Sequence, residues 1–219
     1  MTLHSDIPED MLDDFTMKGQ ISLRYDVKDD RTPKVCESVE LILEMMQRGV
    51  EIESNYPMHD GVLKALLKDV KGKWLVVGSA RPYYEALLLS KGCEVDVWEI
   101  KRKESSVKGL RYIQKEDLEK RVYDGVLAIS SLEHFGLGRY GDPLDPWGDI
   151  RAIDDIRDAL KPWGKVIMSI PCGKDELIWN KHRVYGKHRM SGFLSGWMVK
   201  QYVRENWRNG EETVFELTK

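Results

Sequence analysis

Apolar residues recur along this chain in short continuous blocks, and segments with helical spacing lie between the blocks. The apolar blocks are typical of buried strands and cover residues 73–80, 93–100, 109–113, 123–131 and 165–173. The segments between them predict helices at 81–92, 115–120 and 149–164. Because each crossover helix must pack back onto a face of the sheet, the alternation predicts an α/β fold with a doubly wound, mostly parallel sheet.

The C-terminal segments 197–206 and 212–219 look like two further strands, the first of them ambiguous with a helix. A short turn between them would make an antiparallel pair at the edge of the sheet. This pair brings the expected sheet to seven strands.

Two helices are expected before the first strand. Apolar residues recur at helical spacing from Lys34 to Gly49, and a second helical pattern covers 59–70. Residues 1–33 are mixed and acidic with no sustained period, so we expect a loosely structured arm or a lid. We therefore divide the chain into an N-terminal arm and helix, 1–58, and a second domain, 59–219.

Composition narrows the classes of partner. The 219 residues carry 34 basic against 37 acidic side chains, a net charge of -3, which gives no electrostatic case for nucleic acid or a membrane surface. No apolar run approaches the roughly 18 to 20 residues that span a bilayer, and the first residues are too acidic for a signal peptide. The three cysteines show no C-x-x-C, so we expect a cytoplasmic protein without a thiolate metal site. Nothing indicates the oligomeric state.

The turn after the first strand and the end of the second strand carry candidate binding chemistry. Gly78 lets backbone N–H groups approach a ligand, and the following helix dipole favours a carboxylate or a phosphate. Glu99, about 20 residues later, is placed to accept hydrogen bonds from ribose hydroxyls. Taken singly, each has a plain structural explanation, a tight turn and a solvated acid. Together they favour an adenosine-type ligand.

The loop 130–149 follows the fourth strand, at the sheet edge where open α/β folds bind ligands. Its glycines permit close approach, Arg139 offers a fork of donors, and Asp142 can accept from hydroxyls. The mixture suits a polar, hydroxyl-bearing small molecule such as a sugar or a nucleotide-linked sugar. Alternatively, Asp142 and Asp145 are turn formers before proline and Asp149 caps the next helix.

Several motifs together resemble one superfamily. The order WLVVGSA, VDVWEI, GLRYIQKEDLE, YDGVLAISSLEH and LKPWGKVIMSIP is similar to the class I S-adenosylmethionine-dependent methyltransferases over about residues 60–219. More narrowly, SLEHFGLGRYGDPLDPWGD and IWNKHRVYG resemble an uncharacterised methyltransferase-like family. The resemblance implies a Rossmann-like methyltransferase fold, S-adenosylmethionine as cofactor, and methyl transfer to an oxygen or nitrogen of a polar small molecule.

The resemblance also implies a cofactor site. Gly78, Ser79 and Ala80 would line the methionine moiety, and Glu99 would hold the ribose. Asp117 or Glu116 would lie near the adenine, and Ser130 and Ser131 would border the sulfonium. The superfamily's first motif, acid-x-Gly-x-Gly-x-Gly, is reduced here to one glycine, and Arg81 could offset this by pairing with the methionine carboxylate or could equally face solvent. A catalytically inactive binding or partner subunit is therefore the alternative. A nicotinamide-dependent oxidoreductase would need a glycine-rich dinucleotide turn that this chain lacks.

On the substrate side, the resemblance places Glu133 and His134 toward the acceptor. His134 is our first choice of catalytic base because an unperturbed imidazole is neutral at pH 7, and Asp142 is the second. Further substrate-binding candidates are Arg139, Tyr140, His182, Arg183 and Tyr185. A solvated loop is the plain alternative for the last three. No metal site is expected, because His182 and His188 are not at helical ligand spacing.

Overall fold

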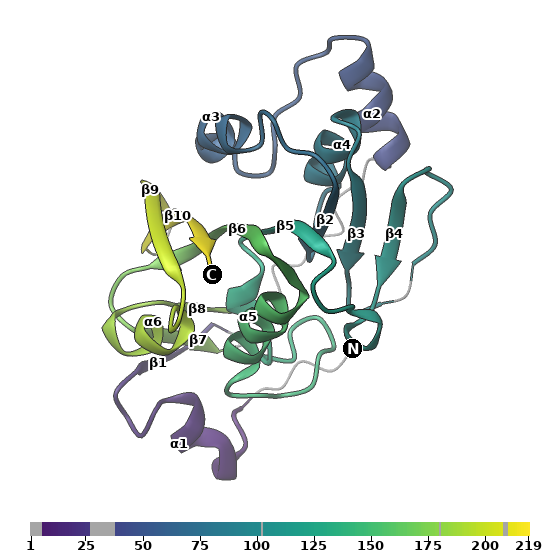
Figure 1. Ribbon diagram of the computed structural model, residues 1–219. Helices are drawn as coiled ribbons and strands as arrows, with labels where there is room; N and C mark the ends of the chain where they lie inside the picture. The colour runs from purple at the N-terminus through teal and green to yellow at the C-terminus, as the bar shows by residue number, and fades with distance from the viewer. Residues whose placement is uncertain (1–5, 27–37, 102, 180, 208–209) are drawn as a thin grey trace.

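The computed structural model describes residues 6–26, 38–101, 103–179, 181–207 and 210–219. Its centre is a seven-stranded sheet of order β4-β3-β2-β5-β6-β10-β9 (Figure 1). The strands are β2 Lys73–Val77, β3 Glu94–Trp98, β4 Leu110–Ile113, β5 Tyr123–Ile129, β6 Leu160–Cys172, β9 Met198–Trp207 and β10 Gly210–Thr218. The first five are parallel, while β10 pairs antiparallel with both β6 and β9. The predicted α/β class, doubly wound sheet and strand number are confirmed.

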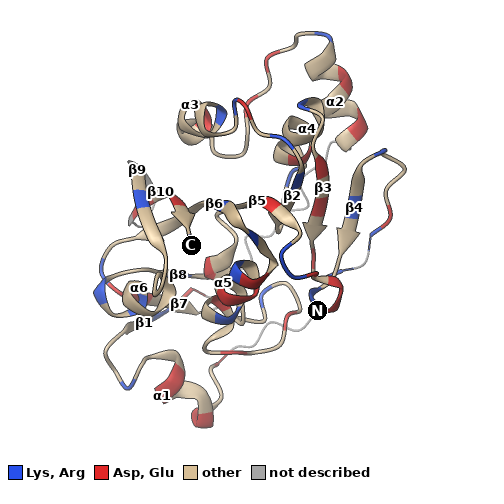
Figure 2. Ribbon diagram, viewed as in Figure 1, with Lys and Arg blue, Asp and Glu red and all other residues tan. Residues whose placement is uncertain are grey.

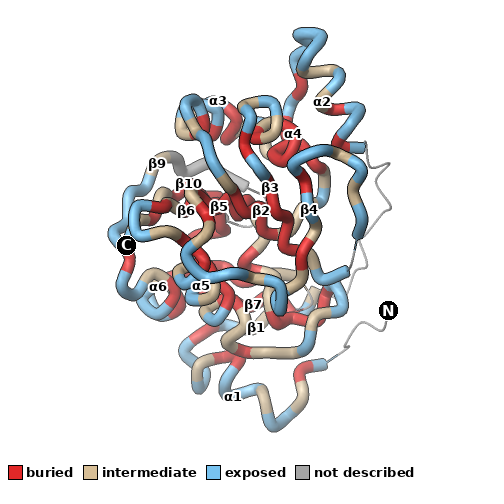
Figure 3. Tube along the Cα trace, turned by 45° about the vertical axis from the view of Figure 1, so that its right-hand side comes forward, coloured by how far each residue is buried: buried red, intermediate tan, exposed pale blue. Residues whose placement is uncertain are grey.

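Helices cover both faces of this sheet. The helices are α2 Val39–Gln47, α3 Pro57–Leu66, α4 Tyr83–Ser90, α5 Gly148–Ala159 and α6 Lys187–Phe193. Because side chains alternate along a strand, Leu75 and Val77 of β2 pack with α5 and α6, whereas Trp74 and Val76 pack with α2, α3 and α4. The centre of the sheet is accordingly buried on both faces (Figure 3). Two helices precede the first strand of this sheet, as the sequence predicts.

The N-terminal segment departs from the sequence prediction. Residues 6–26 are not a loosely structured arm: they contain η1 Glu9–Met11, α1 Leu12–Phe15 and β1 Ser22–Tyr25. Strand β1 pairs in parallel with β7 Glu176–Trp179, and β7 pairs antiparallel with β8 His182–Val184, which makes a second, three-stranded sheet. Phe15 packs edge-to-face on Trp179, with ring centroids 5.2 Å apart. The remainder of the expected arm lies outside the described residues.

Two further elements differ from expectation, and the expected but ambiguous strand at 197–206 is confirmed. Segment 115–120 forms only one 3-10 turn, η2 Lys115–Asp117, because a capping box between Gln114 and Asp117 closes it. Helix α5 ends at Ala159, since the next residue already pairs with β5 as part of β6. The ambiguous C-terminal segment is strand β9.

No helix among the described residues has the length and apolar character that a membrane crossing needs. Basic and acidic side chains are interspersed over the elements (Figure 2). Cys93 and Cys172 are buried free thiols, and Cys36 lies outside the described residues.

Candidate functional site

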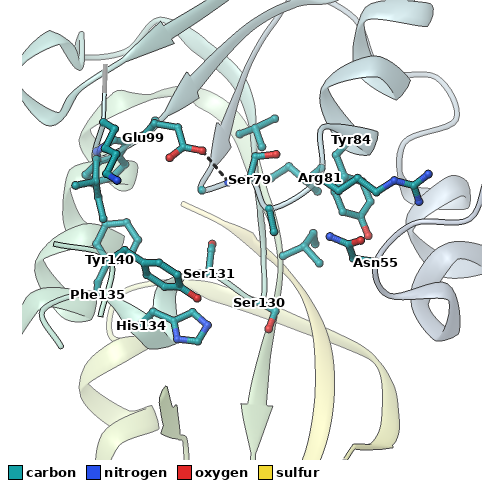
Figure 4. Close-up of a pocket in the computed structure, with 18 of the residues that line it drawn as sticks. Asn55, Ser79, Arg81, Tyr84, Glu99, Ser130, Ser131, His134, Phe135 and Tyr140 are labelled. Carbon is teal, nitrogen blue, oxygen red and sulfur yellow. Dashed lines mark hydrogen bonds between the residues drawn. The ribbon is translucent and has the colours of Figure 1, made fainter. Parts of the chain in front are cut away.

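A cavity of about 410 Å³ lies at the carboxyl ends of β2, β3 and β5. The chain reverses its strand order between β2 and β5, and open α/β sheets bind ligands at such a point. Of the predicted site residues, those that line the cavity are Gly78, Ser79, Ala80, Arg81, Glu99, Ser130, Ser131, His134, Tyr140 and Asp142. The fold thus brings together segments that are far apart in the sequence (Figure 4).

The turn after β2 is shaped by Gly78. Its φ of +64° is in the left-handed region, and a Cβ at this position would lie 3.3 Å from the Cβ of Ser131. Glycine is therefore suited to this position both by its backbone conformation and by the close approach of the chain after β5. The backbone N–H of Gly78 donates to the carbonyl of Trp98 at 3.0 Å, which fixes the turn to the end of β3.

Glu99 follows β3 and faces this turn. Its Oε1 accepts from the backbone N–H of Ser79 at 3.3 Å and lies 3.1 Å from Nζ of Lys103. In Figure 4 the carboxylate stands at the cavity, beside the turn that begins α4. A carboxylate in this position can accept hydrogen bonds from the hydroxyls of a bound ligand.

Ser130, the residue directly after β5, has an unusual backbone conformation. Its φ is +46°, which costs a residue with a Cβ roughly 1 to 3 kcal/mol. The conformation is held by β6, because the Ser130 N–H donates to the carbonyl of Ser169 at 3.0 Å. The Ser130 hydroxyl donates to Oε1 of Glu133 at 2.6 Å. Next to it, Ser131 lines the cavity with a buried hydroxyl oxygen that has no protein partner among the described residues.

Glu133 and His134 lie in the 3-10 turn η3 Leu132–His134 that follows. Glu133 is only 1% exposed, and burial together with the charge of Glu212 raises the pKa of its carboxyl well above the usual range. The Nδ1 of His134 contacts the carbonyl of Lys181, so this nitrogen carries the hydrogen in the neutral ring. Burial and the neighbouring His182 lower the pKa of His134 to about 3. His134 is therefore neutral at pH 7, as expected, but it is a weaker base than an unperturbed imidazole.

Asp142 holds its own loop together. Its Oδ2 accepts from the N–H groups of Gly136 and Gly138, at 2.8 and 3.2 Å, and its Oδ1 accepts from that of Tyr140. These contacts match the turn-forming alternative for this residue. They occupy the carboxylate that the sequence analysis considers as a second base.

Arg183 and Tyr185 lie outside the cavity, in a buried network centred on Asp149. Arg183 donates to the carbonyl of Phe135 at 2.6 Å, and the Tyr185 hydroxyl donates to Asp149 at 2.8 Å. Asp149 also pairs with the buried Arg189 and is not the N-cap of α5. This network ties the loop after β5 to β8 and α6.

Four other predicted residues lie apart from the cavity lining. Glu133 sits behind Ser130, and His182 stacks edge-on against His134 with ring centroids 6.1 Å apart. The guanidinium of Arg139, a buried residue, lies 5.7 Å from the ring centroid of Tyr140. Asp117 is exposed and closes η2 by accepting from the N–H of Gln114.

Arg81 points away from the centre of the cavity (Figure 4). Its guanidinium donates to the carbonyl of Glu53 at 2.6 Å and so connects the turn after β2 with the loop that precedes α3. Two residues of that loop, Asn55 and Tyr56, line the cavity together with Tyr84 of α4. None of these three residues was predicted from the sequence, because their place at the cavity depends on tertiary packing.

The Lys and apolar residues of the lining were also missed. They are Val76, Trp98, Ile100, Lys101, Lys103, Leu127, Ile129 and Phe135. Most of them end or follow the predicted strands, so their position at the cavity follows once the strand order is known. Within the residues that the structure describes, no group of three or more His, Cys, Asp and Glu side chains could hold a metal ion.

Residues 71–218 match the family described as "Caenorhabditis protein of unknown function, DUF268". No curated protein matches the chain in sequence.

Several solved structures that resemble the fold are methyltransferases. A Burkholderia thailandensis 1,6-didemethyltoxoflavin-N1-methyltransferase with bound S-adenosylhomocysteine has a TM-score of 0.60 and 14% identity, over 89% of this chain and 97% of its own. An S-adenosylmethionine-dependent methyltransferase from Archaeoglobus fulgidus has a TM-score of 0.51 and 14% identity, over 83% and 95%. Phosphoethanolamine N-methyltransferase 2 from Haemonchus contortus has a TM-score of 0.53 and 12% identity, over 83% and 57%. The chain therefore has the Rossmann-like methyltransferase fold.

Proposed function

The chain belongs to the family described as "Caenorhabditis protein of unknown function, DUF268", and we propose that it acts as an S-adenosylmethionine-dependent methyltransferase on an oxygen or nitrogen of a polar small molecule. One observation carries the proposal: a cavity at the switch point of the sheet joins the Gly78 turn to Glu99. The solved relatives named above, two of them with S-adenosylmethionine or S-adenosylhomocysteine bound, support it.

The residues present fit this cofactor. Glu99 would accept from the ribose hydroxyls, and the backbone at Gly78 to Ala80 would lie along the methionine. The space beside Gly78, which a Cβ would narrow, and the unpartnered hydroxyl of Ser131 are consistent with a ligand lying there. Arg81 and Asp117 are left out of the proposed cofactor site because their side chains hold Glu53 and η2 instead.

S-Adenosylmethionine supplies a methyl group on a positively charged sulfonium. What the chain must provide is alignment of an acceptor with that methyl and a destination for the acceptor's proton. A single cavity that holds both the cofactor and the acceptor would provide the alignment.

We assign the acceptor to polar lining side chains that are not proposed to contact the cofactor: Asn55, Tyr56, Tyr84, His134 and Tyr140. These groups hydrogen-bond to neutral hydroxyls and amines. Arg139 and Arg183, which were predicted to bind substrate, are not among the lining residues, and Arg183 donates to the carbonyl of Phe135 instead. We therefore place the acceptor among hydroxyl-bearing or amine-bearing small molecules, such as a sugar or a nucleotide-linked sugar.

A titration with S-adenosylhomocysteine tests the cofactor assignment. At about 100 times its dissociation constant the ligand should stabilise the protein by about 2.7 kcal/mol. Glu99→Gln should weaken binding by roughly 10-fold to 100-fold, because the ribose loses a charged acceptor worth roughly 1.5 to 3 kcal/mol. Glu104→Gln, an exposed change outside the cavity, is the matched control and should bind normally.

Thermal denaturation and calorimetry measure both effects. A protein that S-adenosylhomocysteine fails to stabilise would instead support the partner-subunit alternative. Stabilisation by a nicotinamide dinucleotide would favour the oxidoreductase.

A further inference from the structure

Ser130 and Glu133 form a buried hydrogen-bonded pair that opens onto the cavity. Ser130 lines the cavity, and its hydroxyl donates to Oε1 of the 1% exposed Glu133 at 2.6 Å. The second oxygen of Glu133, Oε2, is buried and has no protein partner among the described residues. We infer that Glu133, acting through the Ser130 hydroxyl, takes up the proton that the acceptor loses when it is methylated. This inference rests on the proposed function.

The charged and titratable groups around Glu133 come from several elements. Glu212 of β10 is itself only 2% exposed, and its like charge adds to burial in raising the pKa of Glu133. Arg183 of β8 acts in the opposite direction, and Nε2 of His134 lies 3.6 Å from Glu133 Oε1. Burial raises the pKa of Tyr56 and of Tyr185, and the charge of Glu133 adds to the rise as a lesser cause. Two buried carboxyl groups near one another repel when both are charged, so one of them keeps its proton to a higher pH.

The proposed step balances in atoms and charge. The acceptor oxygen or nitrogen forms a bond to the methyl carbon, and the carbon–sulfur bond breaks with its electron pair left on sulfur. The acceptor's proton passes to the Ser130 oxygen while the hydroxyl proton of Ser130 passes to Glu133 Oε1. One positive and one negative charge are lost together, which favours the step in a site of low dielectric.

The other candidate bases are less suited to this step. The low pKa of His134 makes its imidazole a weak proton acceptor at neutral pH. Asp142 accepts three backbone N–H groups that hold its loop. Glu133 instead reaches the cavity by one short hydrogen bond through a residue held in a strained conformation by β6. Ser130 is thus the catalytic residue, and Glu133 acts through it.

The first experiment follows the carboxyl groups of the ligand-free protein by infrared spectroscopy between pH 5 and 9. We expect a protonated carboxyl band that persists well above the pKa of about 4.3 of an ordinary glutamate. Glu133→Gln should remove one component of this band, beside those of the buried Glu85 and Glu212, and Glu212→Gln should move the midpoint of the Glu133 component to lower pH because a like charge is gone. Glu94→Gln, an exposed control, should leave the band unchanged. A Glu133 that titrates like an ordinary glutamate overturns the inference.

The second experiment measures proton release by calorimetry in buffers of different ionisation enthalpy near pH 7.5. S-Adenosylmethionine carries a positive sulfonium and S-adenosylhomocysteine does not, so the first should release more proton on binding. Glu133→Gln should abolish the difference without changing S-adenosylhomocysteine affinity more than about threefold. Ser130→Ala, which keeps Glu133, should retain the proton release.

The outcomes separate the two proposals. If neither ligand binds the wild-type protein, the proposed function fails, whatever the infrared band shows. If both bind and release equal amounts of proton, the cofactor site stands and the role of Glu133 is refuted. With an acceptor found by screening, Ser130→Ala and Glu133→Gln should each lower kcat by roughly 10² to 10⁴. An unchanged kcat and pH profile in either variant would also refute the role.

Discussion

Gly78 and Ser130 are the two residues at which the backbone leaves ordinary strand geometry beside the cavity. Both have positive φ, and only the first is a glycine. Gly78 makes room for the chain at Ser131, whereas Ser130 keeps a side chain that reaches Glu133. The difference agrees with their proposed roles, because a ligand needs space at the first position and a hydroxyl at the second.

Gly78→Ala should reduce both stability and cofactor affinity. A Cβ in the left-handed region costs roughly 1 to 2 kcal/mol, and here it also meets the Cβ of Ser131 at 3.3 Å. Gly49→Ala is the matched control, since Gly49 has φ +74° with no atom within 4 Å of a Cβ. Both variants should lower the thermal midpoint, and only Gly78→Ala should weaken binding of S-adenosylhomocysteine. Equal affinities in the two variants would place the ligand elsewhere.

At the scale of elements, strands could be predicted where neighbouring residues in the sequence identify them. The strands β2, β3 and β5 are continuous apolar blocks, so both they and the residues at their ends, such as Gly78 and Glu99, were predicted. Strand β1 has only four residues with an exposed and half-exposed pattern, and its partner β7 lies in the C-terminal half of the chain. A pairing between two distant segments leaves no periodic pattern of apolar residues in either of them. For the same reason, the sequence does not reveal that Asn55 and Tyr56 line the cavity, because their place there depends on tertiary packing.

The second sheet supports one wall of the cavity, because the carbonyl of Lys181 holds His134. Phe15→Ala should therefore loosen this wall without unfolding the main sheet. Phe15 is 2% exposed and packs on Trp179, so the truncation should cost about 3 to 5 kcal/mol within the small sheet. Hydrogen exchange should speed up at 176–184 and stay slow in β5 and β6. Leu12→Ala, at a 39% exposed residue, is the control and should change neither region.

At the scale of the whole molecule, several acids are buried in the folded state. Glu85 of α4 is fully buried, neither of its oxygens has a hydrogen-bond partner in the described part of the chain, and burial raises its pKa to about 7. Burial also raises the pKa values of Glu133 and Glu212. The folded protein thus holds protons that the unfolded chain releases above about pH 4.3.

The stabilising contribution of these three buried acids should therefore fall as the pH rises. The contribution of Glu85 is complete below the unfolded pKa and is lost as the pH rises toward about 7, at up to about 1.4 kcal/mol per pH unit. Glu85→Gln removes this ionisation, so its free energy of unfolding should fall less between pH 5 and 7. Denaturant titrations at several pH values measure the slopes, with Glu94→Gln as the exposed control. Parallel curves for Glu85→Gln and the wild type would show that Glu85 ionises normally.

The cavity draws on residues inside and outside the stretch that matches the family. Residues 71–218 match the family, whereas Asn55 and Tyr56, which also line the cavity, lie ahead of that stretch. Gly78 and Glu99, which are proposed to hold the cofactor, lie inside it. On the proposed function, substitutions in the preceding loop would change which acceptor is methylated while the methyl donor stays the same. One donor site could in this way serve enzymes with different acceptors through changes in a short segment alone.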